Sequence, residues 1–182
     1  MITKTGTNTW TFIPFSGGSA PAVISSTTGS PTITTSGTAT IYKFTGDGTL
    51  VVATAGLATV LLVGGGGGGL NGSYGGGSGR VLIGDHTLPA GTLTVSVGAG
   101  GAGGAAILSY VPAPSSALGT LVTGKAGAWG QAGTAANYGY ESSITGSALI
   151  YAKASVSPRA NFGDGSDSSA GGSSGVVIVR VG

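Results

Sequence analysis

Few residues of this chain could carry out catalysis. Its one histidine, His86, directly follows Asp85, and the chain has no cysteine. An aspartate and a histidine can together activate a serine when their side chains cooperate, but neighbouring residues of a strand point to opposite faces. The pattern therefore favours a surface histidine on a strand over a catalytic pair. Without cysteine, neither a disulfide nor a thiolate metal site can form.

The acidic residues are equally sparse. They are Asp47, Asp85, Glu141, Asp164 and Asp167. A glycosidase needs two acids about 5–10 Å apart, and the spacing of these five predicts no such pair. Asp47 and Asp164 each stand in Gly-Asp-Gly, which is typical of a turn, although the stretch from Asp164 to Asp167 could form part of a weak calcium site. We predict no catalytic, metal or cofactor site and no enzyme.

The sequence also lacks a complete phosphate-binding loop, a basic cluster for nucleic acid and a membrane-spanning segment. Residues 119–126 approach a phosphate-binding loop, but Ala126 replaces the required hydroxyl and no helix can follow. The net charge is +2 with no basic cluster, which argues against nucleic-acid binding. The longest apolar run, 58–63, is far too short for a membrane helix. The first residues lack an apolar signal core, so we expect synthesis in the cytoplasm without processing.

The composition favours strands. Glycine supplies 39 of the 182 residues, charged residues 7% and hydrophobic residues 40%, which fits neither a disordered chain nor collagen. Glycine costs a helix about 1 kcal/mol per residue. The apolar patterns predict strands over 38–44, 49–53, 57–63, 80–88, 92–97 and 176–181, and one or two short strands within 142–153 around a turn at Gly146. We expect the first two to form a hairpin and 57–63 to be a central strand buried on both faces.

Glycine-rich segments alternate with these strands, at 64–79, 98–104, 124–139 and 163–175. They could be flexible linkers. Alternatively, extended glycine segments can lie side by side and hydrogen-bond through their backbones. We favour the second interpretation, because the apolar segments between them are too short to be separate domains. The prediction is an all-β, small antiparallel β-sandwich-like domain with extended polyglycine II-like segments over 38–182, preceded by a Thr/Ser-rich arm or attachment segment at 1–37.

Aromatic residues in or beside the glycine-rich segments are the candidates for receptor or subunit contact. They are Tyr74, Tyr110, Trp129, Tyr138 and Tyr140. Such rings provide large contact areas for recognition, and they could equally cover the glycine segments or fill a subunit interface. The low charge predicts association into a homo-oligomer.

Several pieces in a fixed order resemble one known family. Residues 44–50 read Phe-Thr-Gly-Asp-Gly-Thr-Leu, Val60-Leu61-Leu62-Val63 runs into six glycines, and 88–95 read Leu-Pro-Ala-Gly-Thr-Leu-Thr-Val. Val97-Gly98-Ala99-Gly100-Gly101 and the ending 175–181 follow. This order resembles the glycine-rich domain of phage tail fibres and minor tail proteins. Residues 105–157 depart from it, since relatives often carry further glycine runs there.

The resemblance implies a virion protein at a tail tip or fibre, commonly a homotrimer, whose partners are other virion proteins and sometimes a glycan or protein of the host surface. It carries over no receptor-binding residue. A capsid-decorating head protein is the structural alternative, and a virion-borne enzyme that degrades cell-surface polysaccharide is the alternative from another class. An extracellular matrix protein and an ice-binding protein are two further interpretations.

Overall fold

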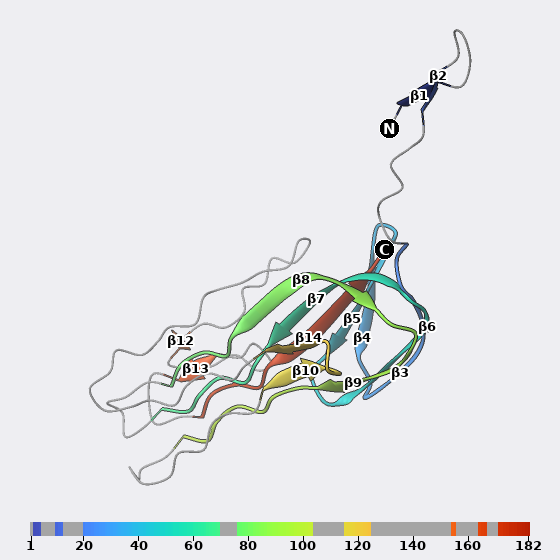
Figure 1. Ribbon diagram of the computed structural model, residues 1–182. Coiled ribbons are helices and arrows are strands. Elements are labelled where there is room, and N and C mark those ends of the chain that lie inside the picture. The colour runs from blue at the N-terminus through green and yellow to red at the C-terminus, as the bar shows by residue number, and fades with distance from the viewer. Residues whose placement is uncertain are drawn as a thin grey trace.

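Two antiparallel five-stranded sheets pack face to face and form a β-sandwich (Figure 1). The computed structural model describes residues 2–4, 10–12, 20–69, 76–103, 115–124, 154–155, 164–166 and 171–182, and no helix occurs among them. The all-β, sandwich-like prediction is confirmed. The strands are β1 (Ile2–Lys4), β2 (Trp10–Phe12), β3 (Val23–Thr28), β4 (Thr32–Ser36), β5 (Ala39–Phe44), β6 (Gly48–Thr54), β7 (Gly56–Val63), β8 (Val81–Leu88), β9 (Gly91–Ser96), β10 (Ser116–Leu118), β11 (Val122–Gly124), β12 (Ala154–Ser155), β13 (Gly165–Ser166) and β14 (Val176–Val181).

The strand order differs from a chain of simple hairpins. The first sheet has the order β11-β10-β9-β6-β3, and the second has β4-β5-β14-β7-β8. The predicted hairpin of 38–44 with 49–53 is wrong, because β5 pairs with β4 and β14 whereas β6 pairs with β3 and β9. Residues 45–47 therefore cross between the sheets. Alternation of apolar residues shows which face of a strand is buried, but it does not identify the partner strand.

Two edge strands come from the segment predicted to be an arm. β3 and β4 lie at the edges of the first and second sheets, joined by a turn in which Gly29 and Ser30 have positive φ angles of 79° and 51°. The sandwich therefore includes residues 20–36, which the predicted boundary at residue 38 left out. Strands at an edge are mostly exposed, so their Ser- and Thr-rich sequences show no apolar alternation.

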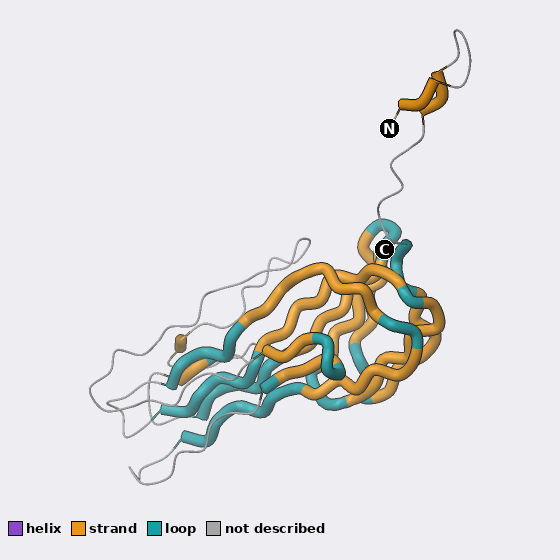
Figure 2. The backbone as a smooth tube through the Cα atoms, in the orientation of Figure 1, coloured by secondary structure: helices purple, strands orange, loops and turns teal. Residues whose placement is uncertain are grey.

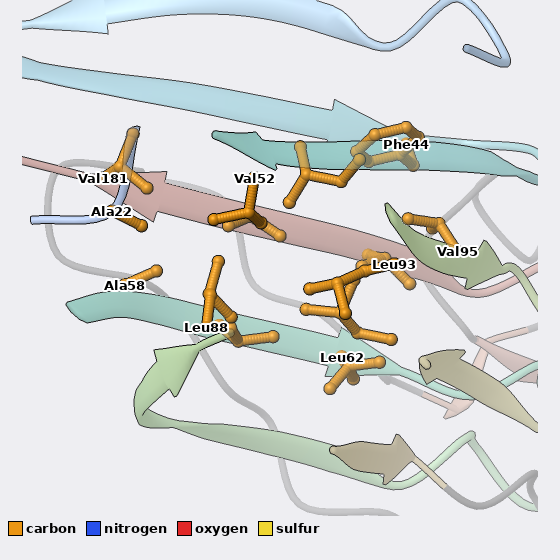
Figure 3. Close-up of a cluster of buried hydrophobic side chains, with 14 residues drawn as sticks. Ala22, Phe44, Val52, Ala58, Leu62, Leu88, Leu93, Val95 and Val181 are labelled. Carbon is orange, nitrogen blue, oxygen red and sulfur yellow. The ribbon is translucent and has the colours of Figure 1, made fainter. Parts of the chain in front are cut away.

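The main core fills the space between the sheets. Phe44, Leu50, Leu62, Leu88 and Val95 are fully buried there. Figure 3 shows Phe44, Leu62, Leu88 and Val95 among the apolar side chains that converge from both sheets. A smaller buried cluster lies on the other side of the second sheet. Its members are Leu61, Val63, Val176 and Ile178. The prediction that 57–63 is a central strand is thus confirmed, and its burial on both faces is confirmed from Val60 to Val63, whereas Leu57 and Thr59 are half-buried.

The sandwich has two different ends. At one end Leu57, near the start of β7, exchanges backbone hydrogen bonds with Ala20 and Ala22, and Gly182 lies against Thr38 and Ala39. We call this the terminal end. At the other end β7 finishes at Val63 and the glycine-rich segments begin. Figure 2 shows these segments, drawn as teal loops, extending from the strands on the side away from the C-terminus.

Candidate functional site

Strands of both sheets continue into glycine segments that lie side by side. Residues 64–69 follow β7, 76–80 precede β8, 98–103 follow β9 and 171–175 precede β14, while 164–166 include β13. We call these five segments the glycine bundle. Nearly all of 64–69 and 76–79 is buried although these residues have almost no side chains. Their burial therefore comes from close backbone packing.

Backbone hydrogen bonds connect the segments to one another. The central segment 64–69 bonds to all four others: Gly64 N–H donates to Arg80 O (3.1 Å), Gly66 N–H to Ser173 O (2.9 Å) and Gly67 N–H to Gly77 O (2.7 Å), while Gly66 O accepts from Gly101 N–H (2.8 Å) and Gly67 O from Ser166 N–H (3.2 Å). Further bonds join the outer segments, among them those from Gly76 N–H to Ser166 O, from Gly172 N–H to Gly101 O and from Gly175 N–H to Gly98 O. Because buried backbone groups require partners, these bonds hold the bundle together.

The spacing of the bundle leaves no room for side chains at many positions. A Cβ added at Gly65 would overlap the carbonyl of Ala99, and one at Gly172 would overlap that of Gly66. The same overlap with backbone atoms arises at Gly68, Gly76, Gly79, Gly100 and Gly175. None of the described bundle glycines has a positive φ. Glycine is thus required here for close approach, and a polyglycine II geometry for these segments stays a prediction.

One serine joins the sandwich to the bundle. The buried Ser116 hydroxyl, on β10 of the first sheet, donates to the carbonyl of Val63 in the second sheet (2.6 Å) and accepts from the Gly98 N–H (3.0 Å). It therefore connects β7 and β9 at the point where both strands give way to glycine segments. Nothing in the sequence around Ser116 indicated this role.

Asp47 supports the same junction from the turn between β5 and β6. Its carboxylate accepts a hydrogen bond from the Val97 N–H at 2.7 Å, just after β9 ends. The interpretation of Gly46-Asp47-Gly48 as a turn fits this contact. The aspartate fixes the backbone at the start of segment 98–103.

We expect Asp47→Ala to lower the free energy of unfolding by about 1 kcal/mol, because the Val97 amide loses a charged acceptor at an exposed position. Urea denaturation of the full chain measures this loss. Asp85→Ala is the matched control, since Asp85 is also exposed but accepts a hydrogen bond from the Thr59 hydroxyl within the second sheet (2.6 Å). The Val97 amide should exchange faster in the first variant only. Equal exchange in both variants would contradict the assigned role.

Buried polar groups lie inside the bundle. Asp164 and Ser173 are linked twice, from the Asp164 N–H to the Ser173 hydroxyl (2.7 Å) and from the Ser173 N–H to the Asp164 carbonyl (2.8 Å). Asp164 is fully buried. The weak calcium site suggested for 164–167 stays a prediction, with Asp167 outside the described residues. In the described part of the chain no three acidic or histidine side chains come together to hold a metal.

The Asp85–His86 pair is divided between the faces of β8, as its strand position predicts. Asp85 pairs with Thr59 and His86 with Ala58, and Ala58 belongs to the main core. A shallow pocket of about 220 Å³ near the terminal end is lined by Asp85, Arg180 and Thr59 with apolar neighbours. Within it the Thr59 hydroxyl donates to the Asp85 carboxylate (2.6 Å).

The five aromatic contact candidates, Tyr74, Tyr110, Trp129, Tyr138 and Tyr140, lie outside the described residues, as does nearly all of the predicted glycine segment 124–139. The structure does describe where the neighbouring chain leaves the bundle. Residues 70–75, which include Tyr74, follow Gly69, and 104–114, which include Tyr110, follow Gly103.

The described residues contain no helix with the length and apolar character needed to cross a bilayer. No protein-family model matches the chain, and searches of the curated proteins and of the solved structures also found no match.

Proposed function

We propose that this chain is a structural protein of a phage particle, in the tail tip or a fibre, and that its glycine bundle presents a host-facing surface. The proposal combines the resemblance of its ordered sequence pieces with the arrangement of the fold. It requires no catalytic step.

The observation that carries the proposal is the opposite placement of the chain ends and the bundle. Ala20 and Gly182 lie at the terminal end, whereas the glycine segments leave from the other end of β7 (Figure 1). An eight-residue strand spans about 25 Å. Attachment through residues 1–19 would therefore leave the bundle pointing away from the particle.

Backbone bonding between the segments makes the bundle a suitable support. A flexible glycine linker would let the residues beyond it sample many positions, whereas segment 64–69 is held by hydrogen bonds to four neighbours. Binding costs less when the contact residues are already positioned. In the proposed role, Tyr74 and Tyr110, in the segments 70–75 and 104–114 that follow this support in the sequence, contact a glycan or protein of the host surface.

Immunogold labelling of phage particles from cells that produce the chain tests its location. We expect label at the tail tip or along fibres. Label over the head would favour the capsid-decorating alternative, and particles without the protein would exclude a virion role. Sustained release of reducing sugar from host envelopes by the purified chain would overturn the non-enzymatic part of the proposal.

Adsorption to host cells tests the contact surface. We expect the double variant Tyr74→Ala, Tyr110→Ala to bind cells at least tenfold more weakly, with an unchanged midpoint of urea denaturation. Truncating aromatic anchors of an interface commonly has effects of this order. The control is Thr87→Ala, which changes an exposed residue of β8. This variant should bind host cells like the unmodified chain. Equal binding by all three proteins would remove these tyrosines from the proposed site.

A further inference from the structure

The edge strands of the two sheets differ in how they are protected. An edge strand exposes unpaired N–H and C=O groups that can pair with another chain, and natural proteins block such pairing with charges, bulges or very short strands. β3 contains register shifts between Val23 and Ser26, β8 carries Asp85 and His86, and β11 has only three residues. Three of the four edges of the two five-stranded sheets are thus protected.

β4 has none of these protections. All five of its residues are exposed, none is charged, and its register with β5 runs without a shift from Thr32 to Ser36. Ile33 is 53% exposed and stands opposite Tyr42, which packs against the main core. This edge therefore offers both a backbone ladder and an apolar side chain beside the core.

In the described part of the chain, the N-terminal strands β1 and β2 lack a larger sheet to pair with, just as the edge of β4 lacks a further strand. β1 and β2 are three residues each and pair with each other but with no other described strand. A two-stranded hairpin is only marginally stable in water by itself, and this one includes the apolar residues Ile2, Trp10 and Phe12. It would gain stability by adding to a larger sheet.

The free edge and the N-terminal strands are within reach of each other. β4 ends close to Thr38 and Ala39, beside Gly182 at the terminal end, and the chain enters the sandwich at Ala20 on the same end. The seven residues 13–19 can span at most about 25 Å. We propose that residues 2–12 of a second copy of this chain add as strands to the free edge of β4, forming a homo-oligomer by strand exchange.

This inference does not rest on the proposed host contact. It identifies a second copy of the chain as the partner that binds at the terminal end of the sandwich. Neither β4 nor β2 carries a charged residue, and residues 2–12 contain Lys4 as their one charged residue, so no like-charge repulsion opposes their pairing. Exchange between copies would bury Ile33 and complete the ladder of β4. Backbone hydrogen bonds provide affinity in such strand addition, and side-chain pockets provide specificity.

Solution mass of full-length variants tests the proposal. We expect the unmodified chain to be an oligomer at micromolar concentration. Ile33→Lys, which places a charge on the accepting edge, and Thr11→Pro, which removes a ladder donor from β2, should each reduce the mass to that of a single 17.1 kDa chain. Ile83→Lys is the matched control and should remain oligomeric, because Ile83 is similarly exposed at 49% but lies on the opposite edge strand, β8.

Mixing the two disrupted variants separates exchange from other causes of dissociation. The Ile33→Lys chain keeps an intact N-terminal segment and the Thr11→Pro chain keeps an intact edge, so their mixture should form a complex of twice the single-chain mass. A mixture that stays monomeric, an oligomeric Thr11→Pro chain or a monomeric unmodified chain would each overturn the proposal. If Ile33→Lys does not fold, Thr34→Lys on the same exposed strand takes its place. Host adsorption is measured separately, so failure of one proposal is distinguishable from failure of the other.

Discussion

Gly65→Ala is expected to lower the free energy of unfolding by about 3 kcal/mol or more, at the upper end for a buried small-to-large change. The added Cβ would overlap the carbonyl of Ala99. Gly65 is buried in the central segment, and the atom that it would strike belongs to a backbone held by its own hydrogen bonds. A side chain could rotate away, but this backbone can yield only if the bundle separates.

Gly46→Ala provides the matched control for this substitution. Gly46 has open space around its Cα and no positive φ, so alanine there should change the free energy of unfolding by no more than about 0.5 kcal/mol. Urea denaturation measures both proteins. Hydrogen exchange at Gly101, whose N–H bonds to Gly66, should accelerate only in Gly65→Ala. If both variants have the same free energy of unfolding, the glycine bundle does not unfold together with the sandwich in one cooperative transition.

Ser116→Ala is expected to lower the free energy of unfolding by about 2–4 kcal/mol. The substitution leaves the Val63 carbonyl and the Gly98 N–H without their buried partner, and each unsatisfied buried group costs about 1–3 kcal/mol. Removing the hydroxyl leaves only a small cavity, so the lost hydrogen bonds account for most of the expected loss of stability. Both orphaned groups lie where the strands join the bundle.

Ser25→Ala is the control for Ser116→Ala. The Ser25 hydroxyl also donates to a backbone carbonyl, that of Val51, but at 3.3 Å and in an exposed position. Its removal should cost less than about 0.5 kcal/mol because water replaces the lost partner. Hydrogen exchange of Gly98 should increase in Ser116→Ala and not in Ser25→Ala. Similar losses of unfolding free energy in the two variants would show that the Ser116 hydrogen bonds stabilise the protein no more than an exposed serine hydrogen bond does.

The central strands were predictable because their own residues determine them. The continuous apolar run ending at Val63 indicated a strand buried on both faces, and 176–181 matched β14 (Val176–Val181). Sheet membership was not predictable in the same way. The turn at Gly46-Asp47-Gly48 suits a hairpin, yet it connects two sheets, because pairing depends on contacts far apart in the sequence.

The candidate site was predictable only in outline. The alternation of glycine runs with short strands favoured side-by-side packing, and the hydrogen bonds of segment 64–69 are of that kind. Ser116 and Ser173 gave no signal, since serines are common in this chain and their importance comes from burial between distant segments. β3 and β4 were missed because exposed edge strands leave no apolar pattern.

The close spacing of the glycine bundle also has a genetic consequence. Every amino acid other than glycine carries a Cβ, so any missense mutation at Gly65, Gly172 or Gly175 meets a neighbouring backbone. Such codons can drift only through synonymous changes. In the proposed host-facing role, substitutions selected by a new host are therefore expected to accumulate in 70–75 and 104–114, which follow the bundle in the sequence. Such changes would alter the proposed contact residues and leave the glycine bundle unchanged.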